Sequence, residues 1–259
     1  MTQMPGHGSN VRPLSGGAVD HENLELTASD GNHFAAFSAQ AEEPAGPAVV
    51  ILPDVRGLHP FYEELALRFA NAGYDSIAFD YFGRTAGVGR RDDEEWDFMS
   101  HVAQTTVEGI SADAQACVDR LRGRAGHEDR AIFTMGFCFG GGNSWIMAQT
   151  INEITGVVGL YGSPTRPQRD GSESVISRVG EFRGRLLGLM GGADQGITAE
   201  DIAEFDEALT AVGLEHKLVT YPGAPHSFFD RHYEEHPDAV EDAWKRVLDF
   251  VQGGSYWAG

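Results

Sequence analysis

Residues 131–142 read AIFTMGFCFGGG, an apolar run followed by a glycine, a cysteine between two phenylalanines, and a row of glycines. A nucleophile spaced between two small residues, with a strand before it and a helix after it, is the sequence form of a nucleophile elbow. In such a turn one reactive side chain, here that of Cys138, stands above the end of a sheet. Glycine suits the flanking positions because the tight turn leaves no room for a Cβ atom. The segment therefore predicts a strand, a reactive turn and a helix whose first N–H groups face Cys138.

Apolar runs suited to strands alternate with helical patterns along the rest of the chain. A hairpin is expected at residues 23–29 and 33–39, because DGN at residues 30–32 is typical of tight turns. Further strands are predicted at residues 45–53, 75–81, 131–137, 154–162, 185–192 and 216–223, and helices at residues 61–73, 105–124, 141–149, 198–213 and 237–252. This alternation predicts an α/β fold with a mostly parallel central sheet and helices on both faces.

Length and composition favour one domain. The chain has 259 residues, of which 41% are hydrophobic, enough for a full core. Residues 1–20 are rich in glycine, serine and proline and show no periodicity. We therefore expect a mobile N-terminal tail at residues 1–20 and a single α/β domain at residues 21–259.

The charge balance limits the partners. Acidic residues outnumber basic ones, 39 to 19, and the formal charge is −20, which opposes binding to nucleic acid or an anionic membrane. No run approaches the roughly 18 apolar residues of a membrane span. The first residues also lack the basic start and apolar centre of a signal peptide. We expect a cytoplasmic protein without nucleic-acid or membrane partners, and the sequence predicts no oligomeric state.

A polar stretch at residues 83–100 contains the charged run RRDDEEWD. It is interpreted as either a surface loop or a cover over the site.

The chain contains only two cysteines, Cys117 and Cys138, too few for a disulfide framework. Cys117 falls among the apolar positions of the helix predicted at residues 105–124 and is interpreted as a buried structural thiol. Cys138 is the candidate nucleophile. A thiol needs a base to become a thiolate, and the base needs a third group to orient it.

Candidates for these two groups follow later strands, at the edge where the loops of a doubly wound sheet meet. Asp194 follows the strand predicted at residues 185–192, and His226 follows the one at residues 216–223. The order nucleophile, acid, histidine is that of the α/β-hydrolase fold. Cys138, Asp194 and His226 are therefore the predicted triad, with His226 as base and Asp194 as its orienting partner.

A further group of histidines matches the spacing of a metal-binding motif but does not suit its geometry. His232, Glu235 and His236 have the spacing of a zinc-peptidase motif, which requires both histidines on one helical face. Pro237 disfavours helical geometry at His236. We predict no metal site and no organic cofactor.

Five segments together resemble the dienelactone hydrolase (carboxymethylenebutenolidase) family, the cysteine branch of the α/β hydrolases. They are LPDVRGLHPFYEELALRFANAGYDSIAFDYFGR, MGFCFGGG, GLYG, LMGGADQGI and YPGAPHSFF, and the resemblance runs over about residues 22–252. It implies the same triad, and it also implies that the N–H groups of Val55 and Phe139 form the oxyanion hole.

The resemblance departs from the family pattern at two charged positions. Family members carry a glutamate that helps to activate the cysteine, and Asp54 stands at that position here. They also hold an anionic substrate with two arginines. Arg84 matches the first, whereas the second position is Asp230, with Arg231 one residue later. Arg56 is interpreted as either a substitute for the second arginine or a solvated side chain.

These observations predict a hydrolase that cleaves a small-molecule lactone or ester, dienelactone-like, through an acyl-cysteine. One alternative is a broad carboxylesterase acting on neutral esters. The other is a non-hydrolytic protein that uses Cys138 as a redox-responsive or ligand-binding thiol.

Overall fold

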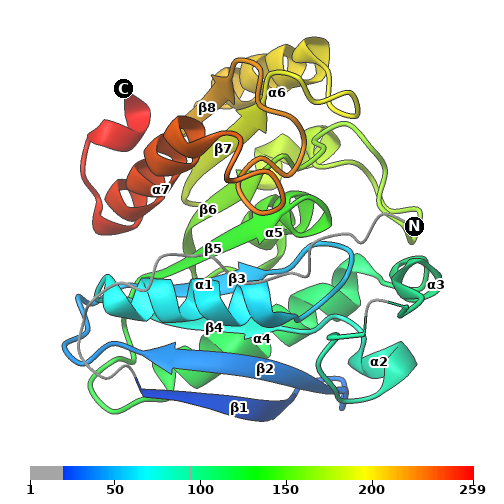
Figure 1. The fold of residues 1–259 in the computed structure, drawn as a ribbon, viewed down its shortest axis with the longest axis vertical. Coiled ribbons are helices and arrows are strands. Elements are labelled where there is room, and N and C mark those ends of the chain that lie inside the picture. The colour runs from blue at the N-terminus through cyan, green and yellow to red at the C-terminus, as the bar shows by residue number, and fades with distance from the viewer. Residues whose placement is uncertain (1–19, 94) are drawn as a thin grey trace.

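The computed structural model describes residues 20–93 and 95–259 (Figure 1). Of the tail expected at residues 1–20, only Asp20 lies within this part of the chain, as the first residue of a strand. The strands are β1 (Asp20–Thr27), β2 (His33–Gln40), β3 (Ala48–Leu52), β4 (Asp75–Phe79), β5 (Ile132–Phe137), β6 (Ile154–Leu160), β7 (Arg185–Gly191) and β8 (His216–Tyr221). The helices are α1 (Pro60–Asn71), α2 (Gly83–Ala86), α3 (Phe98–Val102), α4 (Val107–Arg122), α5 (Phe139–Thr150), α6 (Ala199–Ala211) and α7 (Pro237–Gln252), with short 3₁₀ helices η1 (Ile176–Glu181) and η2 (Tyr256–Ala258).

These eight strands form one sheet in the order β1-β2-β4-β3-β5-β6-β7-β8. β1 pairs antiparallel with β2, as the predicted hairpin, and β2 pairs antiparallel with β4. The other neighbours are parallel, so the mostly parallel sheet of an α/β-hydrolase fold is confirmed. The chain passes from β3 to β4 on one side and returns to β5 on the other. The loops after β3 and β5 therefore diverge at the point where such sheets bind ligands.

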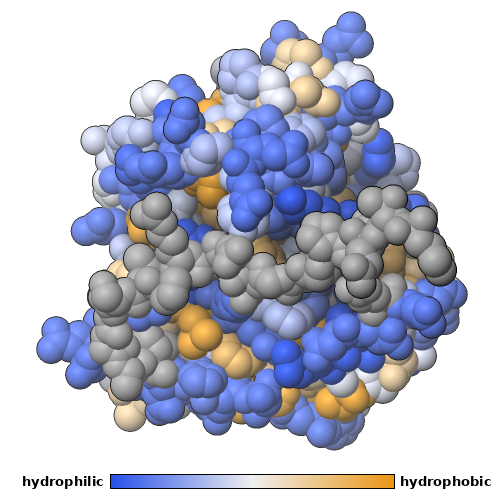
Figure 2. Space-filling view, in the orientation of Figure 1, coloured by the Kyte–Doolittle hydropathy of each residue, from blue (hydrophilic) through white to orange (hydrophobic). Residues whose placement is uncertain are grey.

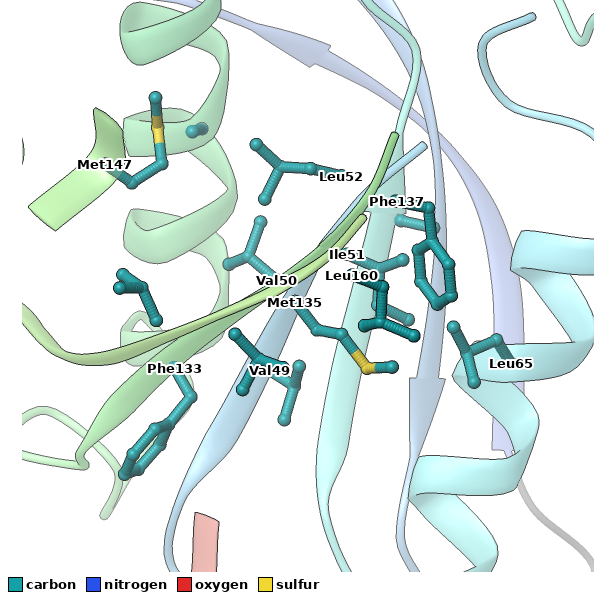
Figure 3. Packing of buried hydrophobic residues seen from close by; sticks show 14 of the residues in the cluster. Val49, Val50, Ile51, Leu52, Leu65, Phe133, Met135, Phe137, Met147 and Leu160 are labelled. Atoms are coloured by element: carbon teal, nitrogen blue, oxygen red, sulfur yellow. The ribbon is translucent and has the colours of Figure 1, made fainter. Parts of the chain in front are cut away.

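Helices cover both faces of the sheet (Figure 1). α1 packs on β2, β3 and β4 and meets α7 through Phe69 and Trp244, whose ring centroids are 4.9 Å apart. α4 and α5 contact each other, and α5 meets α6 through Trp145 and Phe205, at 5.0 Å between centroids. Figure 3 shows Met147 of α5 on one side of the central strands and Leu65 of α1 on the other.

The central strands are buried because both of their faces are covered. All five residues of β3, AVVIL, are buried, which explains their continuous apolar pattern. Leu52 lies on the Met147 side of the sheet and Phe137 on the Leu65 side (Figure 3). The core thus fixes the direction of β3 and β5, the two strands whose ends carry Asp54 and Cys138.

The predicted helix starts are confirmed where the sequence carries a capping signal. Thr198 and Asp201 form a reciprocal capping box at α6, and Pro237 is the first residue of α7. The polar stretch at residues 83–100 contains α2 and part of α3, which the sequence did not predict. Helices of four and five residues are too short to show a 3.6-residue periodicity.

Hydrophilic residues predominate on the face shown in Figure 2, with small hydrophobic patches between them. Cys117 is buried in α4, as predicted. No helix within residues 20–93 and 95–259 combines the length and the apolar character needed to span a bilayer.

Candidate active site

Cys138 occupies the turn between β5 and α5 in a strained backbone conformation, with φ 54° and ψ −111°. A Cβ atom on Gly136 would collide with the carbonyl oxygen of Gly140, and one on Gly140 would collide with that of Leu52. Only glycine therefore permits this close approach of β5, α5 and β3. The Cys138 N–H donates to the carbonyl of Leu160 at 3.0 Å, which ties the turn to the end of β6. Such strain persists where the surrounding structure holds a reactive side chain in place.

Asp194 and His226 form a hydrogen-bonded pair on the loops after β7 and β8. His226 Nδ1 lies 2.6 Å from Asp194 Oδ2, and the aspartate side chain is only 2% exposed. The Gly196 N–H donates to Asp194 Oδ1 at 2.7 Å and fixes the carboxylate. Because Nδ1 carries the proton in this pair, Nε2 is the nitrogen available to act as a base.

The two loops are joined by their backbones, so the pair has little freedom to separate. The Gly192 N–H donates to the Tyr221 carbonyl at 2.8 Å, and the Ala193 N–H donates to the Ala224 carbonyl at 2.9 Å. The His226 ring also packs on Tyr161, with 4.9 Å between ring centroids. The histidine is thus held from two sides.

The Cys138 thiol is neutral in this arrangement. Burial raises its pKa to about 11, and the charges of Asp54 and Asp230 contribute to the rise, while the Phe139 N–H, hydrogen bonded to the sulfur, opposes it. Within the described residues no hydrogen bond joins the sulfur to His226. The thiol therefore has to be deprotonated before or during its attack on a carbonyl.

The two backbone N–H groups expected to form the oxyanion hole come from different loops. Phe139 is the first residue of α5 and directs its N–H to the sulfur. Val55 follows β3 by three residues, and within residues 20–93 and 95–259 its N–H donates to no acceptor. The helix N-terminus adds a partial positive charge at the same place.

Asp54 lies beside the nucleophile but is held by arginine. Arg56 Nη2 donates to Asp54 Oδ2 at 2.6 Å, and the Arg56 backbone N–H donates to Oδ1 at 2.8 Å. Arg231 Nη2 is 3.9 Å and His59 Nε2 4.0 Å from Oδ2. Although burial opposes ionisation, the nearby His59 ring and the hydrogen bonds and charge of Arg56 keep the pKa of Asp54 well below its usual range. Asp54 is thus a buried carboxylate.

The structure does not bring Arg84 together with Arg56 and Arg231. Its Nη1 donates to Asp113 of α4 at 2.5 Å, and its Nη2 donates to Asp30 of the β1–β2 turn at 2.7 Å. β2 lies between β4 and β1, on the far side of β4 from β5. The guanidinium is therefore turned toward the hairpin edge, where Asp113 is fully buried and needs a cation.

Asp230 and Tyr161 are site residues to which the sequence reasoning gave no role. The Tyr161 hydroxyl donates to Asp230 Oδ1 at 2.7 Å. Tyr161 follows β6 directly and has a φ of 39°, and it lies in the segment GLYG that carried part of the resemblance. A polar aromatic residue immediately after a parallel strand was the available signal.

The loop after β4 lies over the loop after β3. The Arg91 N–H donates to the Leu58 carbonyl at 2.8 Å, and the Trp96 indole N–H donates to the Arg56 carbonyl at 3.3 Å. Arg91 also pairs with the buried Asp80 at 2.9 Å. Of the two interpretations of residues 83–100, these contacts favour a cover on the loop that carries Arg56.

The zinc-like motif sits in a turn. His232 Nδ1 contacts Glu235 at 3.0 Å, and His236 precedes α7 with a non-helical φ of −130° and ψ of 50°. The histidines do not share a helical face, in agreement with the effect expected of Pro237. Among the described residues no cluster of histidine, cysteine and acidic side chains is arranged to hold a metal ion.

Comparisons with known proteins agree on one family. The model of the dienelactone hydrolase family matches residues 34–254. A protein of Escherichia coli provisionally named carboxymethylenebutenolidase is 26% identical over 261 residues, which cover 97% of this chain and 96% of that protein.

Solved structures show the same fold. A provisionally named dienelactone hydrolase of Klebsiella pneumoniae matches with a TM-score of 0.81 and 22% identity, over 91% of this chain and 99% of that one. An esterase of Pyrococcus furiosus matches with a TM-score of 0.69 and 18% identity, over 91% and 93% of the two chains. The shared architecture and the family match, which spans most of the sheet and all three predicted triad positions, lead to one conclusion: the chain belongs to the dienelactone hydrolase family.

Proposed function

We propose that this protein hydrolyses a carboxylic ester or lactone through an acyl-cysteine formed on Cys138. Its family and its structural relatives make it a hydrolase. The observation that carries the proposal is the 2.6 Å pair of His226 and Asp194, on the same rim of the sheet as the strained Cys138 turn. A thiol, an oriented histidine and a buried carboxylate are the groups that nucleophilic acyl transfer requires.

In the first half-reaction the Cys138 sulfur attacks the carbonyl carbon while the thiol proton passes to His226 Nε2. The N–H groups of Val55 and Phe139 donate to the resulting oxyanion. The carbon–oxygen bond to the leaving group then breaks, and His226 returns its proton to the departing alkoxide. Asp194 stabilises the imidazolium throughout.

In the second half-reaction His226 removes a proton from water, and the hydroxide attacks the thioester. The carbon–sulfur bond breaks, the acid leaves, and the proton returns to the sulfur. Each step uses residues that follow β3, β5, β7 and β8, and none needs a metal or an organic cofactor.

Asp54 is proposed to act on the thiol. Its charge contributes to the raised pKa of Cys138, so the two groups lie close. While Arg56 donates to it at 2.6 Å, Asp54 is a weak base. A substrate that competes for Arg56 restores its basicity, so thiol activation accompanies binding.

The charged side chains favour neutral substrates over anionic ones, as in the carboxylesterase alternative. Arg84 is bound to Asp30 and Asp113, and Arg56 is bound to Asp54. Arg231 remains the most exposed of these arginines, at 49% of its side chain. An anionic lactone therefore finds one exposed cation rather than a two-arginine clamp.

The test is stopped-flow hydrolysis of an anionic dienelactone and a neutral aryl ester by the native protein and by Cys138→Ala. We expect turnover of the neutral ester by the native protein and none by the variant, with the fold retained. Accumulation of a thioester on Cys138 in rapid-quench mass spectrometry identifies the covalent intermediate. Full activity of Cys138→Ala excludes the acyl-cysteine mechanism, and a stable adduct without turnover favours the non-hydrolytic thiol protein.

A further inference from the structure

Asp230 is a buried carboxyl group to which the proposed reaction gives no role. Its side chain is 3% exposed, and its Oδ1 accepts the hydrogen bond from Tyr161. Its other oxygen, Oδ2, is also buried, and within residues 20–93 and 95–259 it accepts no hydrogen bond. A buried carboxylate oxygen without a donor is costly, so its persistence calls for a reason.

The neighbours of Asp230 place it close to the candidate active site. Arg56 Nη2, which donates to Asp54, is 3.8 Å from Oδ2, beyond hydrogen-bond distance. Tyr161, which holds the other oxygen, packs on the ring of His226. Asp230 therefore lies between the Asp54–Arg56 pair and the triad histidine. Its charge is also one of those that raise the pKa of the Cys138 thiol, which agrees with this position.

The groups around Asp230 do not supply the missing donor. Arg56 has its short hydrogen bonds on Asp54, at 2.6 and 2.8 Å. Arg231 points to Asp54 at 3.9 Å and is half exposed. Tyr161 has one hydroxyl proton, and it is directed to Oδ1. Since no described residue donates to Oδ2, a molecule bound beside Cys138 can supply the donor.

We propose that Asp230, positioned by Tyr161, is an acceptor subsite for a hydroxyl group of the substrate, so that the preferred substrates are hydroxy-substituted esters or lactones. This inference rests on the proposed function. A neutral hydroxyl fits better than an ammonium group because Arg56 already places a cation 3.8 Å from Oδ2. A carboxylate on the substrate meets the Asp230 charge and is disfavoured. A site built to bond a substrate hydroxyl discriminates strongly against analogues that lack the donor.

The native protein provides the first test, by steady-state hydrolysis of γ-butyrolactone and its 2- and 3-hydroxy, 2- and 3-methoxy and 3-carboxylate derivatives. Each kcat/KM is divided by the rate constant for hydroxide-catalysed hydrolysis, which removes intrinsic reactivity. We expect one hydroxy-lactone to exceed its methoxy analogue roughly tenfold, since methoxy accepts but cannot donate a hydrogen bond. Equal normalised values, or a preference for the carboxylate, overturn the inference.

Asp230→Asn provides the second test, because the amide oxygen can keep the Tyr161 hydrogen bond while an NH₂ group replaces Oδ2. The hydroxy-to-methoxy ratio should fall roughly tenfold, and alkylation of Cys138 by iodoacetate relative to iodoacetamide should rise severalfold. The matched control is Asp75→Asn, a buried aspartate that pairs with Arg130 at the opposite end of the strands. It should leave both ratios unchanged.

The two proposals fail in different ways. If γ-butyrolactone or an aryl ester is cleaved through Cys138 but both ratios are the same in native protein and Asp230→Asn, only the acceptor subsite is wrong. If no ester is cleaved, the proposed function is wrong and the subsite falls with it. If Asp230→Asn does not fold, the comparison of hydroxy and methoxy lactones on the native protein still decides the inference.

Discussion

The groups on the two sides of Cys138 are held in place by different kinds of interaction. On the side of β7 and β8, Asp194 and His226 are held by backbone hydrogen bonds between their own loops, at 2.8 and 2.9 Å. Around Asp54, which follows β3, the groups are long charged side chains that compete for partners: Arg56 follows β3, Arg231 lies on the loop after β8, and both approach Asp54. In the proposed reaction the first group carries out the acyl transfer, and the second group determines which substrate binds.

A substitution at Asp194 tests the β7 and β8 side most directly. Asp194→Asn keeps an oxygen for one of its two donors but cannot both fix the His226 tautomer and offset its charge. We expect kcat on a neutral aryl ester to fall about 10³-fold with little change in thermal stability. The measurement is kcat together with the melting temperature of native and variant proteins.

The chain offers a matched histidine–aspartate pair as control. His216 Nε2 contacts Asp206 at 3.2 Å, away from the triad loops. Asp206→Asn should leave kcat unchanged within about twofold. If Asp194→Asn loses less than about tenfold, Asp194 is not the partner that orients the base.

The side of β3 and β4 is expected to act through charge: burial raises the pKa of Cys138 to about 11, and the charge of Asp54 adds to this rise. Asp54→Asn removes a negative charge beside the thiol, which favours the thiolate, so the pKa of Cys138 should fall. The rate of Cys138 alkylation by iodoacetamide at pH 8 should then rise roughly fivefold, and its pH profile should shift to lower pH.

Peptide mass spectrometry separates Cys138 from the buried Cys117 in this assay. Asp113→Asn, on α4 beside Arg84, is the control for loss of a buried carboxylate elsewhere. An unchanged pH profile in Asp54→Asn would show that desolvation alone keeps the thiol protonated and that the Asp54 charge does not act on it.

The same contrast explains what could be predicted from the sequence. The sheet and the positions of the candidate triad residues at its edge could be predicted because apolar periodicity fixes strands, and strand ends fix loops. The tight turn around Gly136 and Gly140 could be predicted because the turn at Cys138 excludes any side chain at these two positions. Each of these is a property of the backbone and leaves a local pattern.

The hydrogen bonds and ion pairs between side chains leave no local pattern in the sequence. Arg84 matches a substrate-binding position in the motif, but its ion pairs with Asp30 and Asp113 join residues 54 and 29 positions away. The hydrogen bond between Tyr161 and Asp230 spans 69 positions. Long side chains choose among partners that only the folded chain brings together, so the substrate side could not be predicted residue by residue.

Arg84 gives the smallest expected effect on activity, and for that reason it sharpens the comparison. Arg84→Met removes the cation from Asp113, whose side chain is fully buried. Unfolding free energy should fall by about 1–3 kcal/mol, while kcat/KM for neutral ester and anionic lactone stays within about twofold. Urea denaturation and steady-state kinetics measure the two effects.

The control is Arg120→Met, which breaks a more exposed pair with Glu22. It should lower the unfolding free energy by less than about 1 kcal/mol. If Arg84→Met instead raises KM for the anionic lactone alone and leaves stability intact, Arg84 turns toward the site when an anion binds, and the substrate side is more adaptable than its ion pairs indicate.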